Sequence, residues 1–336
     1  MAIAAIVALG LMGACGGVSD DARQAGSPNG GRPTTSTPSS VTAATTVEVT
    51  AATSPPQDEV ATTTAVPVGS APLEAFEGSG VWIDVYEWSP SSTDGSPGVT
   101  PDQVADMAAA GMTTLYIQSA RTSRAVDVAD PERFREFVDA SHAHDMDVVS
   151  WYLPNHTDPE TDLRRVLAPL DYGVDGIGID LESKNLADRA LRNERAIELV
   201  RNAADLASDV PVGAVVFAPQ ALSRYEPETW PDFPWAEVAA EADLMVPMAY
   251  WTIYADEFPE SDDPVAYTAE TLASLRSLVG PDTPIHSAGG LLGDSDVEEV
   301  TAAVQTAREA GAIGVSMYSW SGVKPGQLIS MQEEPR

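Results

Sequence analysis

The sequence predicts an α/β protein of the (β/α)8 barrel class over residues 78–325. Short apolar runs alternate there with longer segments of helical periodicity, and the pair recurs through about 255 residues, the length of one such barrel. A doubly wound open sheet would alternate in the same way and is the second alternative. It usually has a glycine-rich phosphate turn after its first strand, whereas the chain reads VYEWSPSSTDG at that place.

The apolar runs define the expected strands, and the periodic segments between them define the expected helices. The strands are expected at 81–88, 113–120, 147–154, 176–183, 211–219, 243–251, 284–291 and 313–320. The helices are expected at 101–111, 131–145, 160–170, 185–207, 234–242, 263–279 and 296–311, with a short one after Val323. Start signals such as TPDQ and DPER precede two of these helices, and Gly111, Gly280 and Gly311 follow three of them.

The chain before the barrel is predicted to be a signal peptide followed by a tether. The apolar run 2–12 is too short to span a bilayer, and LMGAC resembles a bacterial lipobox that ends at Cys15. Residues 1–14 would be the signal, Cys15 the lipidated N-terminus, and 15–77 a disordered spacer rich in Ser, Thr, Pro and Ala. We therefore expect a lipid-anchored protein on the outer face of the cell membrane. A cytosolic protein with an apolar N-terminus is the alternative.

Composition narrows the possible partners. The chain has 51 acidic and 18 basic residues, a net charge of −33, which would repel nucleic acid. A single cysteine excludes an internal disulfide, and the sequence lacks a cofactor fingerprint. His142 and His144, two positions apart on one expected helix, point in different directions and are expected to face solvent. We expect a monomer with no metal and no cofactor, and residues 326–336 as a C-terminal tail.

Two acidic residues end the fourth apolar run, GIGIDLES. Side chains alternate along a strand, so Asp180 and Glu182 share one face with Gly176 and Gly178. The carboxyl ends of the strands carry the active site in barrels of this class. An acid whose pKa is raised by apolar surroundings and a neighbouring carboxylate can protonate a glycosidic oxygen. The two glycines would leave open space beneath the ligand.

Aromatic and polar residues end the other runs, and flat rings suit the apolar faces of sugars. The expected ligand contacts are Tyr86, Gln118, Tyr152, Tyr250, Trp251, His286, Tyr318 and Trp320. His286 could equally pack inside the barrel, and His156, which follows the third run, is a weaker candidate. Together with the acids, these side chains predict a polysaccharide or another glycan as the partner.

These residues resemble the family 18 glycoside hydrolases, chitinases and endo-N-acetylglucosaminidases, which carry DGxDxDxE on the fourth barrel strand. Asp175, Gly176, Asp180 and Glu182 match that motif. The resemblance implies that Glu182 is the acid/base and that Asp180 orients the N-acetyl group of the substrate, whose carbonyl is the nucleophile. It also implies that Tyr250, in LMVPMAYW, holds the N-acetyl oxygen.

The resemblance also places Trp320, at the end of the eighth run, at the floor of the subsite. Three positions depart from the family pattern: Gly178 replaces the middle Asp, Leu181 an aromatic residue, and Trp251 a common Asp. The loss of the middle Asp puts substrate-assisted chemistry in question.

The alternative chemistry is a conventional retaining mechanism, which needs a second carboxylate ~5 Å from Glu182. Asp84 is the candidate for that carboxylate. Its segment, WIDVYEW, also resembles the first strand of the family 25 muramidases, which keeps peptidoglycan among the possible substrates.

We therefore expect a glycosidase that cleaves an N-acetylhexosamine-containing glycan. One alternative is a carbohydrate-binding lipoprotein that has lost catalysis, for which Gly178 is the best argument. Another is a structural envelope protein whose pocket is filled by its own loops, because a fold does not decide a function.

Overall fold

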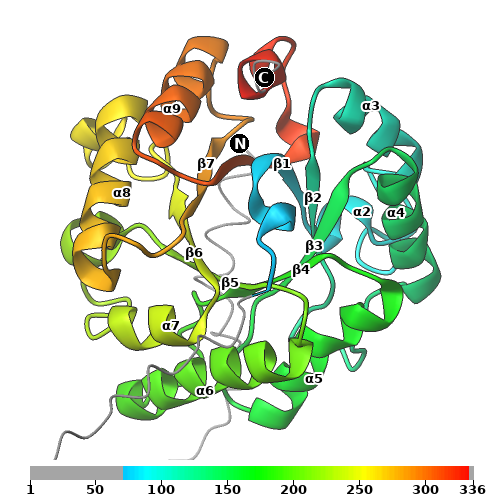
Figure 1. Cartoon of the computed structure of the whole chain (residues 1–336), viewed down its shortest axis with the longest axis horizontal. Helices are drawn as coiled ribbons and strands as arrows, with labels where there is room; N and C mark the ends of the chain where they lie inside the picture. The colour runs from blue at the N-terminus through cyan, green and yellow to red at the C-terminus, as the bar shows by residue number, and fades with distance from the viewer. Residues whose placement is uncertain (1–70, 333–336) are drawn as a thin grey trace, which may run out of the picture. The chain divides into compact units, whose positions relative to one another are not determined.

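The computed structural model describes residues 71–332, which form a closed barrel of parallel strands with helices around it (Figure 1). The strands follow one another in sequence order, and β1 pairs with β8 to close the ring. This confirms the predicted (β/α)8 class. Cys15, the predicted signal and most of the predicted tether lie outside the described residues.

The strands and helices alternate along the chain as expected. The strands are β1 (Gly78–Ile83), β2 (Thr114–Gln118), β3 (Asp147–Tyr152), β4 (Gly176–Asp180), β5 (Val212–Phe217), β6 (Leu244–Ala249), β7 (His286–Leu291) and β8 (Gly314–Tyr318). The α-helices are α2 (Val85–Trp88), α3 (Val104–Ala109), α4 (Pro131–Ala143), α5 (Pro159–Leu167), α6 (Arg189–Ala207), α7 (Trp235–Glu241), α8 (Pro264–Val279) and α9 (Val297–Glu309). Shorter helical turns are η1 (Glu74–Phe76), η2 (Pro101–Gln103), η3 (Ala168–Tyr172), η4 (Ala221–Tyr225), η5 (Pro259–Ser261), η6 (Trp320–Gly322) and η7 (Gln327–Met331).

The first strand ends five residues earlier than the predicted run 81–88, because a helix begins there. The Asp84 carboxylate accepts a hydrogen bond from the Tyr86 amide at 2.7 Å, and the Glu87 carboxylate accepts one from the Asp84 amide at 2.9 Å. This reciprocal pair is a capping box, so residues 85–88 form α2 rather than strand. The prediction of strand structure for Tyr86 was therefore wrong.

Large side chains fill the inside of the barrel. A Cβ atom at Gly176 would lie 2.9 Å from carbons of both Phe76 and Val149, and one at Gly178 would lie 3.2 Å from the Trp151 Cβ. The glycines of β4 therefore make room for neighbouring side chains. The predicted open space beneath the two acids is absent, as the packed interior of such barrels requires.

The folded part extends beyond 78–325 at both ends. Phe76 of η1 is fully buried at the amino end of the barrel. Near the other end of the chain, the Met331 carbonyl accepts hydrogen bonds from the Ser79 hydroxyl and from the Arg308 guanidinium. Residues on both sides of the predicted bounds therefore pack against the barrel.

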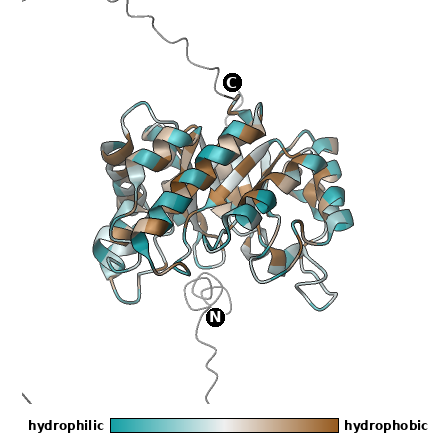
Figure 2. Ribbon diagram, turned by 90° about the horizontal axis from the view of Figure 1, so that it is seen from below, coloured by the Kyte–Doolittle hydropathy of each residue, from teal (hydrophilic) through white to brown (hydrophobic). Residues whose placement is uncertain are grey.

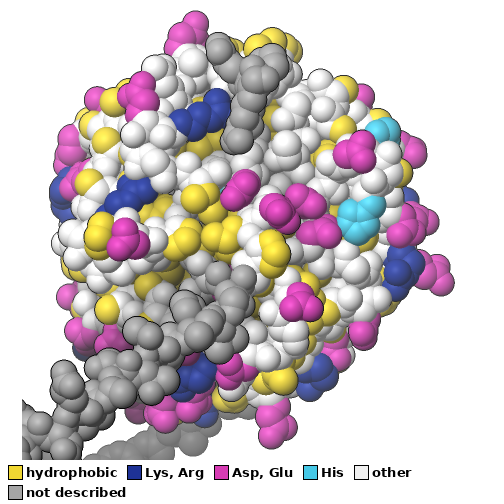
Figure 3. Space-filling view, viewed as in Figure 1, with side chains coloured by type: hydrophobic (Ala, Val, Ile, Leu, Met, Phe, Trp, Pro, Cys, Tyr) yellow, Lys and Arg dark blue, Asp and Glu magenta, His cyan; other side chains and the backbone are white. Residues whose placement is uncertain are grey.

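The helices shield the strands from water. Figure 2 shows hydrophobic residues colouring the central strands and a mixture of hydrophobic and hydrophilic residues along the helices. The apolar residues of the helices belong to the core around the barrel. The face in Figure 3 carries scattered acidic side chains and fewer basic ones, in keeping with the net charge of −33. Within residues 71–332, no helix is long and apolar enough to cross a membrane.

Candidate active site

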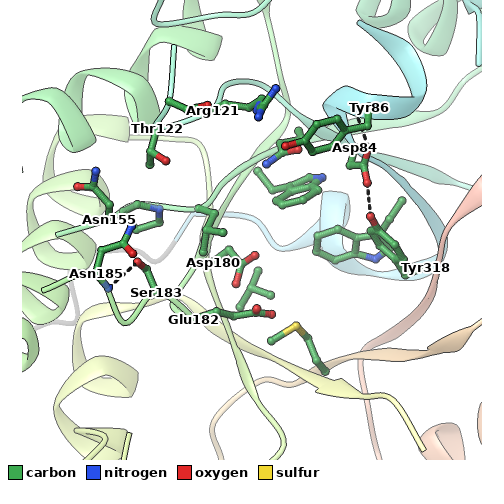
Figure 4. A pocket seen from close by; sticks show the side chains of 18 of the residues that line it. Asp84, Tyr86, Arg121, Thr122, Asn155, Asp180, Glu182, Ser183, Asn185 and Tyr318 are labelled. Atoms are coloured by element: carbon green, nitrogen blue, oxygen red, sulfur yellow. Dashed lines mark hydrogen bonds between the residues drawn. The ribbon is translucent and has the colours of Figure 1, made fainter. Parts of the chain in front are cut away.

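A cavity of about 450 Å³ lies at the carboxyl ends of the strands (Figure 4). Its walls come from β1 to β6 and β8, or from the loops that follow them. The floor contains the rings of Trp82 and Trp151, whose centroids are 5.6 Å apart in an edge-to-face arrangement. The cavity thus combines an aromatic floor with acidic residues on its walls, as predicted for the carboxyl ends of the strands.

Asp180 and Glu182 both line this cavity. Asp180 is the last residue of β4 and is 7 % exposed, and Glu182 follows two positions later with a half-buried side chain. Burial, followed by the charge of Glu226, raises the pKa of Glu182 to about 7. Burial, followed by the charge of Glu182, raises the pKa of Asp180 above its usual value of 3.8. The pair therefore retains a proton close to neutral pH.

Asp180 has an unused hydrogen-bond acceptor. Its Oδ1 atom is buried and has no hydrogen-bond partner among the residues that the structure describes. A buried polar atom without a partner is costly, so such atoms commonly face a ligand or a water molecule. Asp180 is therefore available to bind a donor placed in the cavity.

Tyr250 follows β6 and lines the same cavity with 8 % of its surface exposed. Burial, then the charges of Glu182 and Asp180, raise its pKa well above its usual value of 10.0. The phenol thus keeps its proton at any pH at which the protein would function. It is placed to donate a hydrogen bond near the acid pair.

Asp84 lines the cavity, but hydrogen bonds from the protein occupy both of its oxygens. Oδ1 accepts from the Tyr86 amide, and Oδ2 accepts from the Tyr318 hydroxyl (Figure 4). Burial raises the pKa of Asp84, while these hydrogen bonds and the charge of Arg121 partly offset that rise. Asp84 therefore caps α2 and holds Tyr318 in place, and a nucleophilic role for it stays a prediction.

Tyr86, Gln118 and Tyr318 also line the cavity, as predicted for ligand contacts. Tyr86 is 44 % exposed and forms part of the rim. The Gln118 side-chain oxygen accepts a hydrogen bond from the Val85 amide at 3.1 Å, which ties β2 to α2. The structure thus brings three of the predicted ligand contacts together with the acids.

Tyr152 and Trp251 do not line the cavity. They are 1 % and 0 % exposed and belong to the core between strands and helices. The Tyr152 hydroxyl donates to Asp162 at 2.8 Å, and the neighbouring Trp151 enters the cavity in its place. Successive side chains of a strand point to opposite faces, so only one of Trp151 and Tyr152 can enter the cavity. The prediction chose the one that faces the helices.

His286 lies inside the barrel below the cavity. Its Nδ1 is 2.7 Å from the Phe76 carbonyl oxygen and its Nε2 is 2.7 Å from the Ser316 hydroxyl. Burial lowers its pKa to about 4, so it packs as a neutral side chain. This is the packing alternative for His286, and the prediction of a substrate contact is corrected.

Trp320 also lies away from the cavity. It begins η6 after β8 has ended, and it packs half-buried against the outer core. Tyr318, the last residue of β8, lines the cavity at this edge instead. The predicted floor position of Trp320 is therefore corrected.

Two histidines outside the cavity, His142 and His156, contact other residues of the protein. His142 Nε2 is 2.8 Å from the Asp175 carboxylate, which also accepts from the Val148 amide at 2.8 Å. Asp175 therefore anchors the amino end of β4 to β3 and α4. His142 and His144 are both exposed, as predicted. His156 is buried with its ring centroid 5.9 Å from that of Trp230, and burial lowers its pKa to about 4.

Two acids near the site, Glu87 and Glu226, were given no functional role in the sequence-based prediction. Glu226 follows the η4 turn, and its charge contributes to the raised pKa of Glu182. Glu87 accepts a hydrogen bond from the Ser319 hydroxyl at 2.6 Å, and burial and the charge of Asp84 raise its pKa to about 7. The spacing DVYE was a usable signal for Glu87, since it is that of a capping box. Glu226 lies in an irregular loop that offers no such pattern.

These features define a (β/α)8 barrel whose aromatic-floored pocket holds a protonatable acid pair at the carboxyl ends of the strands. No family model matches the sequence, and no curated protein matches it either. Solved structures do match its fold.

Three solved structures illustrate this similarity. The spore cortex-lytic enzyme SleL of Bacillus cereus aligns with a TM-score of 0.54 at 11% identity, over 76% of this chain and 73% of that chain. A family 18 chitinase from Cycas revoluta, in complex with (GlcNAc)4, aligns with a TM-score of 0.56 at 14% identity. The alignment covers 75% of this chain and 98% of the chitinase. A class V chitinase from Pseudomonas fluorescens aligns with a TM-score of 0.55 at 10% identity, over 76% of this chain and 98% of that chain. The protein therefore shares the barrel fold of these three proteins.

Proposed function

We propose that the protein is a glycoside hydrolase that cleaves a glycan containing N-acetylhexosamine, with Glu182 as its general acid/base. The observation that carries this proposal is the position of Glu182, with its pKa raised to about 7, in a cavity floored by aromatic rings. A carboxylic acid that keeps its proton near neutral pH can donate it to a leaving oxygen.

In the proposed reaction, Glu182 transfers its proton to the glycosidic oxygen as the bond from that oxygen to the anomeric carbon breaks. The N-acetyl carbonyl oxygen of the substrate then bonds to the anomeric carbon. The unpartnered Oδ1 of Asp180 would accept a hydrogen bond from the N-acetyl N–H, and the Tyr250 hydroxyl would donate one to the N-acetyl oxygen. The Glu182 carboxylate finally takes a proton from the water that opens this intermediate.

The missing middle Asp of the motif bears on this mechanism. At Gly178, the side chains of Trp151 and Val215 occupy the space beside the Cα atom, with carbons 3.2 and 3.4 Å from an added Cβ. An acidic side chain at position 178 would therefore require Trp151 to shift by a few tenths of an ångström. In this protein Glu182 is the neighbouring acid whose charge acts on Asp180.

The decisive experiment compares Glu182→Gln with the unchanged protein on chito-oligosaccharides and peptidoglycan, using an assay for new reducing ends. We expect turnover to fall about 10²- to 10⁴-fold, the usual contribution of a general acid. Glu194→Gln, on an exposed position of α6, removes the same charge and is expected to leave turnover unchanged. Full hydrolysis by the Glu182 variant would remove this residue from the mechanism.

A carbohydrate-binding protein without turnover is the second candidate. The absence of an acid at position 178 favours it, because the family motif has an Asp there. Calorimetry that shows chito-oligosaccharide binding, together with no new reducing ends at any pH from 4 to 8, would favour binding over catalysis.

We further propose that the protein acts as a monomer on the outer face of the cell membrane, held by a lipid at Cys15. The support for this anchor is the sequence LMGAC and the Ser-, Thr- and Pro-rich segment that follows it. A glycan substrate of the cell envelope would be within reach of such an anchored domain.

A further inference from the structure

The wall of the cavity after β2 contains a single basic side chain, that of Arg121. Among the lining residues, all of which lie in the described part of the chain, it is the only Lys, Arg or His. The whole chain has only 18 basic residues against 51 acidic ones, so a cation at the pocket is notable. Its surroundings indicate what it can bind.

The guanidinium of Arg121 is held in place by an aromatic ring. Its central carbon lies 4.3 Å from the centroid of the Tyr86 ring, a cation–π contact at the rim of the cavity. This contact uses the face of the guanidinium and leaves its N–H donors free to meet a ligand.

Arg121 contrasts with two arginines of the outer surface that are paired with acidic residues. Arg164 and Arg201 each bind a carboxylate at 2.8 Å. The guanidinium of Arg121 forms neither an ion pair nor a hydrogen bond with any residue between 71 and 332. Its donors are therefore available on the side of the cavity.

Neutral hydrogen-bonding groups extend this wall. Thr122 and Ser123 follow Arg121 on the same loop, and Asn155 and Asn185 line the cavity from the loops after β3 and β4. Figure 4 shows Arg121 and Thr122 on one side of the cavity, with the acid pair of β4 across from them. The cavity thus has Arg121 and hydroxyls on one side, where Asp84 also lies beside Tyr86, and the acid pair of β4 on the other.

The acids of the cavity do not prevent an anion from binding at this wall. Asp84, whose pKa is affected by the charge of Arg121, has both oxygens occupied by hydrogen bonds from Tyr86 and Tyr318. The pKa values of Asp180 and Glu182 are both raised, that of Glu182 to about 7, so these two acids are more readily protonated near neutral pH than ordinary carboxyl groups. The negative charge of the cavity near neutral pH is therefore smaller than its count of acids implies.

We propose that Arg121 forms a subsite for a carboxylate on the glycan, so that the preferred substrate is an acidic N-acetylhexosamine polymer rather than a neutral one. A carboxylate is planar and matches the paired N–H donors of a guanidinium, with which it forms two parallel hydrogen bonds. Thr122 and Ser123 supply further donors to the same group. This inference deepens the proposed hydrolase activity and rests on it for the catalytic measurement.

The test uses two substrates that differ at one substituent of the glycan, which is a carboxylate in one and its neutral reduction product in the other. Peptide-free glycan strands of alternating N-acetylglucosamine and N-acetylmuramic acid carry a free lactyl carboxylate, and chemical reduction of that carboxyl gives the neutral counterpart. We expect the unchanged protein to prefer the carboxylated strands by about 10- to 100-fold in kcat/KM, the range that a charge-assisted hydrogen bond contributes. The preference is expected to shrink as salt is added.

Three variants separate Arg121 from general charge effects. Arg121→Gln is expected to remove the preference, and Arg121→Lys to retain part of it, because a lysine keeps the charge without the fork of donors. Arg124→Gln, on the same loop but outside the lining residues, removes an equal charge and is expected to retain the preference.

The outcomes separate this inference from the proposed activity. Equal hydrolysis of both substrates, or a preference that survives in Arg121→Gln, overturns the subsite and leaves the hydrolase proposal intact. If neither glycan is hydrolysed, the hydrolase proposal fails, and calorimetry on the same pair of strands still tests the subsite. Equal binding of the two strands, or no binding of either, then overturns the proposed Arg121 subsite.

Discussion

Replacing the proposed acid by its amide should stabilise the protein at alkaline pH. The pKa of Glu182 rises from 4.5 to about 7 on folding, so the folded state binds more protons than the unfolded state between those values. Stability is therefore lost as the pH rises through that range. At about 1.4 kcal/mol per pKa unit, ionisation of Glu182 lowers the free energy of unfolding by at most about 3 kcal/mol.

The half-buried position of Glu182 reduces this bound, because water at the rim screens its charge. We therefore expect Glu182→Gln to be about 1–2 kcal/mol more stable than the unchanged protein at pH 8, and to differ by less than about 0.5 kcal/mol at pH 5. Glutamine cannot ionise, and other groups that titrate in this range, such as Glu87, cancel in the comparison.

Urea denaturation at pH 5 and pH 8, followed by circular dichroism, measures these differences. Glu194→Gln on the exposed face of α6 is the matched control and should show no gain that depends on pH. If Glu182→Gln is equally stable or less stable at pH 8, ionised Glu182 is not destabilised by burial. Burial would then not account for a raised pKa of Glu182.

Two further predictions follow from the same site. The rate of hydrolysis should fall about tenfold per pH unit above pH 7, because Glu182 loses the proton that it donates, and a rate that stays flat to pH 9 would contradict its role as general acid. Gly178→Asp should lower stability by about 1–3 kcal/mol in urea denaturation, because its Cβ would lie 3.2 Å from the Trp151 Cβ. Gly98→Asp adds the same side chain where no atom lies within 4 Å, so an equal loss in both variants would refute the packing argument.

The barrel was predictable because its signal is repeated. Each strand is a short apolar run and each long helix has its own periodicity, so an error at one boundary leaves the eightfold pattern intact. The boundaries were less predictable. The run 81–88 is mostly apolar, yet its two acids, Asp84 and Glu87, form a capping box that turns its second half into α2.

The acid pair was predictable from spacing, whereas several ligand contacts were not. Asp180 and Glu182 share a face because they are two positions apart, and the structure places both in the cavity. Tyr152 and Trp251 were assigned to the wrong face, since an apolar strand gives no sign of which alternate side chain points inward. Arg121 lies in a loop, where the sequence carries no periodicity that would place it at the cavity.

The two ends of the described chain meet at the base of the barrel. Ser79, near the start of β1, donates a hydrogen bond to the carbonyl of Met331 in η7, while the cavity is at the carboxyl ends of the strands. A fluorescent label or an immobilising linker attached close to either end would therefore sit on the side opposite the cavity mouth. Long, insoluble polymers could then reach the cavity even when the protein is fixed to a surface by that side.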